Sequence, residues 1–62
     1  MNDDPAQQLR QLRHDLANPL AALLAVTQLL LLRADALDEE AVSSIREIEA
    51  LARRMRDMLA SA

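Results

Sequence analysis

Apolar residues recur along the chain at steps of three and four residues in two separate stretches. The first stretch contains Leu9, Leu12, Leu16, Leu20, Leu23, Thr27, Leu30 and Leu31, with Thr27 as its one polar position. The second contains Val42, Ile45, Ile48, Leu51, Ala52, Met55, Met58 and Leu59. Steps of three and four place residues on one face of an α-helix, so the pattern predicts two amphipathic helices.

Capping residues indicate where each predicted helix begins. Asp4 followed by Pro5 is typical of an N-cap with proline in the first helical position. Asp38 can cap the second helix, whose first turn holds Glu39 and Glu40, because the helix dipole favours negative charge there. We therefore predict one domain, 1–62, with helix 1 over about 5–33, a turn over about 34–37 and helix 2 over about 38–60.

Two long helices joined by a short turn form an antiparallel hairpin. Helix 1, of roughly 28 residues, would be ~42 Å long. One hairpin cannot cover two apolar stripes of this length, whereas two hairpins can do so by pairing. We therefore predict an all-α fold, an antiparallel helical hairpin with a first helix kinked at Pro19, which dimerizes into a four-helix bundle. A generic antiparallel coiled coil without chemistry is the alternative that this pattern leaves open.

The composition supports association of two copies. Hydrophobic residues make up 52% of the 62 residues, yet aromatic residues, glycine and cysteine are absent. The apolar residues are mostly strong helix formers, and the missing glycine argues against strands with tight turns. A domain of ~60 residues buries only ~60% of its unfolded surface and usually needs disulfides, a metal or self-association. With no cysteine and His14 as the single histidine, self-association as a homodimer remains.

Charge and hydropathy argue against two classes of partner. The formal net charge of −3 disfavours nucleic acid, because a phosphate backbone requires a basic face. The apolar run 19–32 is shorter than the ~20 residues that span a bilayer, and no basic segment typical of a signal peptide precedes it. We therefore expect no nucleic-acid partner, no membrane contact by this segment and a cytoplasmic location, which the absence of cysteine fits.

His14 falls on the opposite side of helix 1 from the apolar stripe. With Leu9 at zero on a helical wheel, His14 lies at roughly 140°, Asn18 near 180° and Asp15 near −120°. A lone histidine on a helix is more often an ordinary surface residue. Here, however, Pro19 follows inside the same helix, where proline costs ~3 kcal/mol and leaves the carbonyl of Asp15 without its usual partner. A costly residue beside an exposed His/Asp pair favours a functional site.

The surface beyond His14 carries small and apolar side chains where a solvated helix face usually carries Lys, Glu and Arg. Its positions are Asn18, Ala21, Ala25, Gln28 and Leu32. Such a face allows another protein to lie close against the helix. Coverage of this face by helix 2, or by the partner hairpin, is the alternative.

The segment 14–20, with the sequence His-Asp-Leu-Ala-Asn-Pro-Leu, resembles the H-box of sensor histidine kinases. That motif is a His followed by Asp or Glu, two further positions, Thr or Asn, Pro and Leu, and every one of its positions is filled here. The resemblance covers roughly 9–59, because the apolar helix after the motif and the second helix match as well. Arg13 and Ala17 depart from the pattern, since the family often has Ser and Arg at these positions.

This resemblance implies a dimerization and phosphoacceptor domain, with a role for each motif residue. His14 would accept the γ-phosphoryl group of ATP and pass it to an aspartate on the receiver domain of a response regulator. Asp15 would be a general base or orient the ring, Asn18 would position water for dephosphorylation of the regulator, and Pro19 would be a hinge. The residues that would contact the receiver domain are Ala21, Ala22 and Ala25.

The resemblance also implies partners that lie outside these residues. ATP and Mg²⁺ would bind an ATP-binding catalytic domain of the parent kinase, and this sequence has no glycine-rich loop for them. The chain itself would hold no cofactor and no metal, and would be the part of a protein-histidine kinase that cannot autophosphorylate alone. We expect an excised domain, whose parent kinase could be membrane-anchored, or a stand-alone phosphotransfer protein. A purely structural dimerization module or a degenerate kinase remnant is the alternative, although Asp15 and Asn18 together argue against decay.

Overall fold

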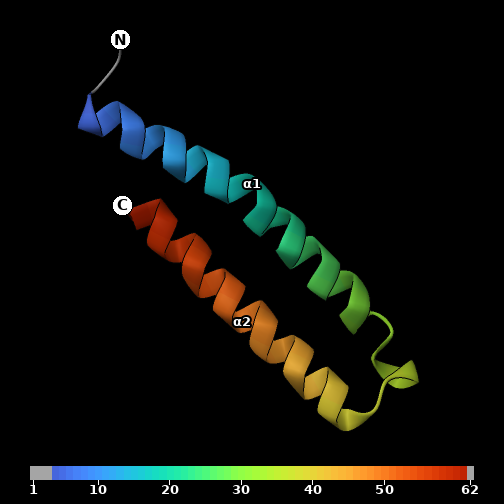
Figure 1. Cartoon of the computed structure of the whole chain (residues 1–62). Coiled ribbons are helices and arrows are strands. Elements are labelled where there is room, and N and C mark those ends of the chain that lie inside the picture. Colours follow the sequence, from blue (N-terminus) through green and yellow to red (C-terminus); the bar gives the residue numbers. More distant parts are fainter. Residues whose placement is uncertain (1–3, 62) are drawn as a thin grey trace.

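The computed structural model describes residues 4–61 and consists of two long helices joined by a short turn (Figure 1). The elements are α1 (Pro5–Leu31), the 3₁₀ turn η1 (Ala34–Ala36) and α2 (Glu39–Ser61). The helices run antiparallel, so the C-terminal end of α2 lies beside the first half of α1. Residues 4–61 contain no strand. The prediction of an all-α helical hairpin is therefore confirmed.

Both helices begin at the predicted caps. The Asp4 carboxylate accepts a hydrogen bond from the amide of Ala6 at 3.0 Å, directly before Pro5 in the first helical position. The Asp38 carboxylate accepts one from the amide of Ala41 at 2.7 Å. Each cap pairs an amide that the helix itself cannot satisfy, and such a bond stabilises a helix by about 1 kcal/mol.

The turn between the helices is built without glycine. Among residues 4–61 no φ angle is positive, so every residue of the turn adopts a backbone that an ordinary side chain allows. Helix α1 ends at Leu31, slightly before the predicted end, because the next hydrogen bonds span three residues instead of four. The amide of Arg33 donates to the carbonyl of Leu30 at 3.0 Å, and the amide of Ala36 donates to the carbonyl of Arg33 at 2.9 Å.

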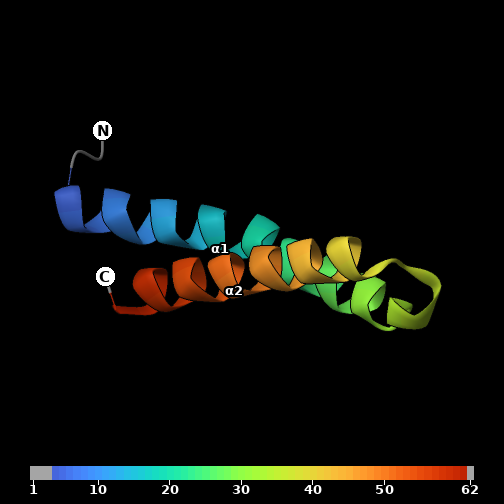
Figure 2. The same cartoon turned by 90° about the horizontal axis from the view of Figure 1, so that it is seen from below.

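Helix α1 continues without a break through Pro19. Proline has no amide hydrogen, so the carbonyl of Asp15 loses its partner one turn further on. The ribbon of α1 changes direction gently near its middle and does not break (Figure 2). The predicted kink is thus a mild bend inside one continuous helix.

The core of the hairpin is small. Leu20, Leu24 and Thr27 of α1 and Ala52 of α2 are all less than a tenth exposed, and Leu59 packs against this cluster. The hydroxyl of Thr27 donates to the carbonyl of Leu24 at 2.8 Å, which satisfies the polar group in this apolar setting.

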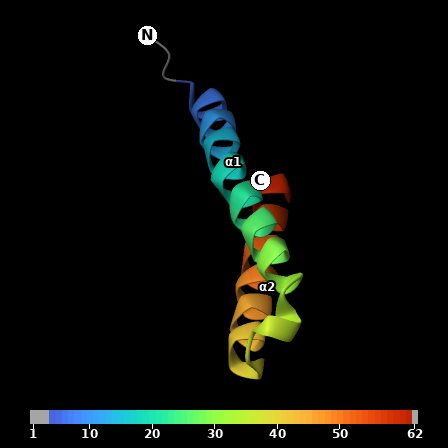
Figure 3. The same cartoon turned by 90° about the vertical axis from the view of Figure 1, so that its right-hand side faces the viewer.

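The hairpin is a single layer of two helices, as its side view shows (Figure 3). Its extents are 52 × 16 × 12 Å and its radius of gyration is 15.4 Å, whereas a compact domain of this length would have a radius of about 11 Å. The accessible surface is 5039 Å², against about 4,000 Å² for a compact monomer of this mass. The excess surface shows that this chain alone buries little.

The predicted stripe of α1 divides into a buried part and an exposed part. Leu20, Leu24 and Thr27 face α2, whereas Leu16 and Leu23 remain more than two fifths exposed. The large apolar side chains that stay exposed are Leu9, Leu12, Leu16, Leu23, Val26, Leu29, Leu30, Leu32, Ile48, Leu51, Met55 and Met58. One hairpin therefore leaves most of its large apolar residues uncovered, as expected from the lengths of the two apolar stripes. The four-helix bundle itself stays a prediction.

By length and composition alone, α1 is long and apolar enough to cross a membrane. The first half of the helix nevertheless carries Arg13, His14 and Asp15, and ionisable residues are costly inside a bilayer. The apolar excess has a simpler origin, because α1 has one apolar face against α2 and a second that is exposed. A mostly buried core helix of a soluble protein and a signal sequence near the N-terminus meet the same criterion, so the expectation of no membrane contact stays a prediction.

Candidate functional site

His14 lies on the outer surface of α1, in the half of the helix that pairs with the end of α2. Its side chain is exposed, and it makes no hydrogen bond within residues 4–61. The neighbouring Arg13 is half-buried at the edge of α2, and Leu16 turns toward the other edge of the hairpin. The ring is therefore positioned by the helix backbone alone and is open to a reagent arriving from solvent.

Asp15 follows His14 in the sequence, but the structure pairs its carboxylate with a different residue. Oδ1 of Asp15 accepts a hydrogen bond from Nε2 of Gln11 at 3.0 Å. Consecutive residues of a helix do not face each other, whereas residues four apart do, and this explains the choice of partner. Sequence reasoning missed Gln11, although the four-residue spacing of an amide and a carboxylate is a signal that could have identified it.

Asn18 and Pro19 lie on different sides of α1. Asn18 is exposed one turn beyond His14, and the four-residue spacing places its amide on the same strip of surface as the ring. Pro19 instead borders an apolar groove at the opposite edge of the hairpin. The structure thus places Asn18 near His14, with Asp15 beside them, and leaves Pro19 to act through the backbone.

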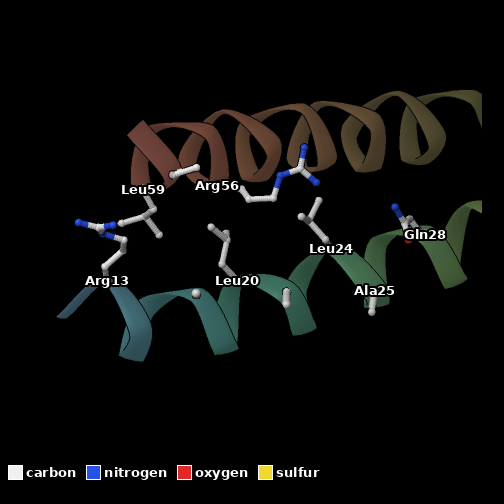
Figure 4. Close-up of a pocket in the computed structure, with 10 residues that line it drawn as sticks. Arg13, Leu20, Leu24, Ala25, Gln28, Arg56 and Leu59 are labelled. Atoms are coloured by element: carbon white, nitrogen blue, oxygen red, sulfur yellow. The ribbon is translucent and has the colours of Figure 1, made fainter. Parts of the chain in front are cut away.

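A groove of about 520 Å³ runs between α1 and α2, beside the turn of α1 that carries His14 (Figure 4). We call it the arginine groove. Its lining residues are Arg13, Ala17, Leu20, Ala21, Leu24, Ala25, Gln28, Arg56, Leu59 and Ala60. Leu20 and Leu24 of α1 and Leu59 of α2 point into the space between the helices, and small alanines make up much of the remaining lining. The groove is therefore an apolar channel with two guanidinium groups at its edges.

The arginine groove includes only part of the predicted docking face. Ala21 and Ala25 line it, but Ala22 is exposed elsewhere on α1. Arg13 extends from α1 toward Leu59 near the end of α2, and the Arg56 side chain runs along α2 toward Leu24. Sequence reasoning treated Arg13 only as a departure from a motif, because no local pattern shows that antiparallel pairing makes Arg13 and Arg56 line one groove.

A second groove, of about 330 Å³, lies at the opposite edge of the hairpin. We call it the apolar groove. Its lining residues are Leu16, Pro19, Leu20, Leu23, Met55, Met58 and Leu59. Leu20 and Leu59 line both grooves, so the two grooves lie on either side of one packed leucine pair. The hairpin therefore has one purely apolar edge and one edge that carries two arginines and lies beside the turn of His14.

The site offers an imidazole, a carboxylate and an amide on one exposed strip of helix. A neutral imidazole nitrogen is nucleophilic near pH 7, and a carboxylate near it can accept a proton or orient the ring. Within residues 4–61, no three His, Cys, Asp or Glu side chains gather closely enough to hold a metal ion. An exposed imidazole with a carboxylate and an amide nearby has the groups that acceptance of a transferred group requires.

Comparison with protein families agrees with this geometry. The model of the His kinase A (phospho-acceptor) domain matches residues 6–61, which include both helices, the turn and the whole motif at 14–20. No curated protein and no solved structure gives a significant match to the chain. Since the family match extends over nearly the whole length, the chain belongs to the His kinase A phospho-acceptor domain family.

Proposed function

We propose that this chain carries phosphate on His14, from an ATP-bound catalytic domain to an aspartate on the receiver domain of a response regulator. Its family forms the phosphoacceptor and dimerization part of protein-histidine kinases, which are transferases. One observation carries the proposal: the ring of His14 is exposed, beside Asp15 and Asn18, on the side of α1 away from the apolar groove. A nucleophile that two proteins reach in turn has to lie on such a surface.

The proposed chemistry consists of two phosphoryl transfers. In the first, a nitrogen of His14 bonds to the γ-phosphorus of ATP while the bond from that phosphorus to the ADP oxygen breaks. In the second, the nitrogen–phosphorus bond breaks and a carboxylate oxygen of the regulator bonds to phosphorus. Asp15 would accept the remaining ring proton or orient the ring, and Asn18 would position water for dephosphorylation of the regulator. ATP and Mg²⁺ would be held by the catalytic domain, which places the reaction in the cytoplasm.

We infer that two hairpins pair through their apolar grooves to form a homodimer. The side chains that would be covered are Leu16, Leu23, Met55 and Met58, which are 42–68% exposed in the single chain. Full burial of such a side chain stabilises by about 1.5–3 kcal/mol, so each can still contribute about 1 kcal/mol. Pairing at this edge would leave His14 of both protomers open to solvent.

We further propose that the receiver domain docks along the arginine groove. The alanines of α1 allow close approach of a partner helix, and Leu24 offers an apolar contact beneath it. Arg13 and Arg56 would attract an acidic surface, so the receiver domain is expected to present carboxylates to this groove. Docking there would bring the receiver domain's phosphoacceptor aspartate to the side of α1 where His14 is exposed.

Phosphate labelling tests the central proposal. The chain, mixed with ATP and the catalytic domain of a histidine kinase, should acquire acid-labile phosphate, and His14→Gln should abolish the label. Gln keeps a polar side chain on an exposed helix position, so the variant should fold as the wild type does by circular dichroism. Labelling that survives His14→Gln would contradict the assignment. A dimer that takes no label at all would instead favour a purely structural dimerization module.

A further inference from the structure

We propose that Gln11 is a positioning residue for this chemistry, which holds the carboxylate of Asp15 on the N-terminal side of the His14 ring. The inference rests on the proposed function of His14. It starts from the hydrogen bond of 3.0 Å that Nε2 of Gln11 donates to Oδ1 of Asp15. Both side chains are exposed, as His14 is, so a phosphoryl donor that reaches the ring also reaches this pair.

The spacing of the three residues makes Gln11 a neighbour of both others. Gln11 lies three residues before His14 and four before Asp15, and residues at these spacings share one patch of helix surface. Helical side chains lean toward the N-terminus, so the imidazole and the carboxylate both lean over the turn that carries Gln11. The amide of Gln11 is therefore well placed to determine where the carboxylate stands relative to the ring.

The chemistry of the two groups determines which atoms meet. An ionised carboxylate only accepts hydrogen bonds, so the amide must present Nε2 to Asp15 and direct Oε1 elsewhere. One carboxylate oxygen is thereby occupied, and the second is left for a proton of the ring. His14 and Asp15, as consecutive residues, point about 100° apart on the helix, so the carboxylate gains from a third group that restricts its rotation.

A purely structural pair would behave differently from a positioning residue. A pair at this spacing that only supports the helix changes helix content and leaves the chemistry of His14 untouched. A positioning residue changes the rate of phosphate acceptance while helix content stays the same. The effect should also vanish once Asp15 can no longer act, because Gln11 is argued to work only through that carboxylate.

Phosphoramidate, a small phosphoryl donor, allows the test on the full 62-residue chain without a catalytic domain. A ring nitrogen of His14 bonds to phosphorus, the phosphorus–nitrogen bond of the donor breaks, and ammonia leaves with that bonding pair. The donor's nitrogen is already protonated, and the ring's remaining proton passes to Asp15 or water. The rate of formation of acid-labile phosphate is followed by phosphorus NMR.

Gln11→Glu keeps the shape of the side chain but removes the donor and adds a like charge. Losing the favourable pair should lower the population of the favourable carboxylate orientation about twofold, and the new repulsion should lower it about twofold again. Labelling should therefore slow about fourfold. Gln8→Glu is the matched control, because it adds the same charge on the same helix with Leu12, not a carboxylate, four residues later. Gln11→Lys restores a donor and should recover the rate when compared with Gln8→Lys.

The outcomes separate this inference from the proposed function. Equal labelling of Gln11→Glu, Gln8→Glu and the wild type would overturn the role of Gln11 and leave His14 as the phosphoacceptor. A fourfold slowing that persists in an Asp15→Asn background would also overturn it, because the effect would not pass through Asp15. If the wild type acquires no phosphate, or only phosphate that His14→Gln also acquires, both proposals are overturned.

Discussion

The two edges of the hairpin are built from the same pair of helices but differ in chemistry. At one edge, the apolar groove contains leucine and methionine side chains and almost nothing polar. At the other edge, the arginine groove combines alanines with Arg13 and Arg56, and it lies beside the exposed His14. Leu20 and Leu59 form the wall between the grooves. The difference fits the proposed function, in which the apolar edge associates with a second copy and the other edge carries phosphate.

This separation follows from the geometry of α1. The exposed apolar positions 12, 16 and 23 lie roughly 160° around the helix from His14. A helix carrying two faces so far apart can bury one in a dimer and keep the other in water. Substitutions at one edge should therefore leave the function of the other edge intact.

The largest effect should come from a charge in the apolar groove. Met55→Glu would place two unpaired carboxylates in the proposed dimer interface, each costing several kcal/mol. The dissociation constant of the dimer should rise more than about 100-fold. Since one hairpin buries few side chains, helix content should fall with it. Sedimentation equilibrium and circular dichroism measure the two effects.

Ala60→Glu is the matched control, because Ala60 lies near the same end of α2 but lines the arginine groove. It should leave the dimer unchanged. A wild-type chain that is a stable, folded monomer would contradict the role of the apolar groove. If Met55→Glu and Ala60→Glu weaken the dimer equally, the dimer interface is not confined to the apolar groove.

The helices and their ends could be predicted from the sequence because their signals are local. Asp4 and Asp38 cap the helices that they were predicted to cap, and the three- and four-residue periodicity locates both helices. The exposure of His14 also follows, since it depends only on the helical angle from the apolar stripe. The roles of the motif residues came from the resemblance to the family and stay predictions.

Other features depend on how α2 is placed against α1, which no local pattern contains. A wheel assigns Leu20 and Leu23 to one stripe, yet the structure buries the first and exposes the second. That Arg13 and Arg56 line the same groove likewise depends on the register of the antiparallel pair. The bond between Gln11 and Asp15 is local and could have been predicted from the four-residue spacing.

A smaller effect, on the edge that carries His14, should follow from Asn18→Ala. If Asn18 positions the attacking water, its loss should slow dephosphorylation of the regulator about 100-fold, comparable to the loss of one well-placed hydrogen-bonding group in an active site. Phosphate acceptance by His14 should change much less, and the dimer should be unaffected. Equal losses in dephosphorylation and acceptance would count against the water-positioning role. Both rates can be measured on one preparation with a purified, phosphorylated receiver domain.

The smallest effect should come from reversing one charge at the arginine groove. Arg56→Glu should slow transfer from phosphorylated His14 to a receiver domain about tenfold at low salt, because it exchanges attraction for repulsion of an acidic partner. The existing contact between Arg56 and Asp57, at 3.5 Å on the surface, is weak and should not offset this loss. Stopped-flow measurement of the transfer rate at several salt concentrations reports the effect.

Arg54→Glu makes the same charge change on α2 at an exposed position that lines neither groove, and it should have little effect on transfer. The difference between the two variants should shrink as salt rises. Dissolved ions largely screen exposed charges that are more than about 10 Å apart at 0.1 M, and this distance falls as salt is added. A difference that persists at high salt would point to a change in packing of the groove. No difference at low salt would place the receiver domain away from Arg56, so that only the exposed strip around His14 would distinguish this edge from the apolar one.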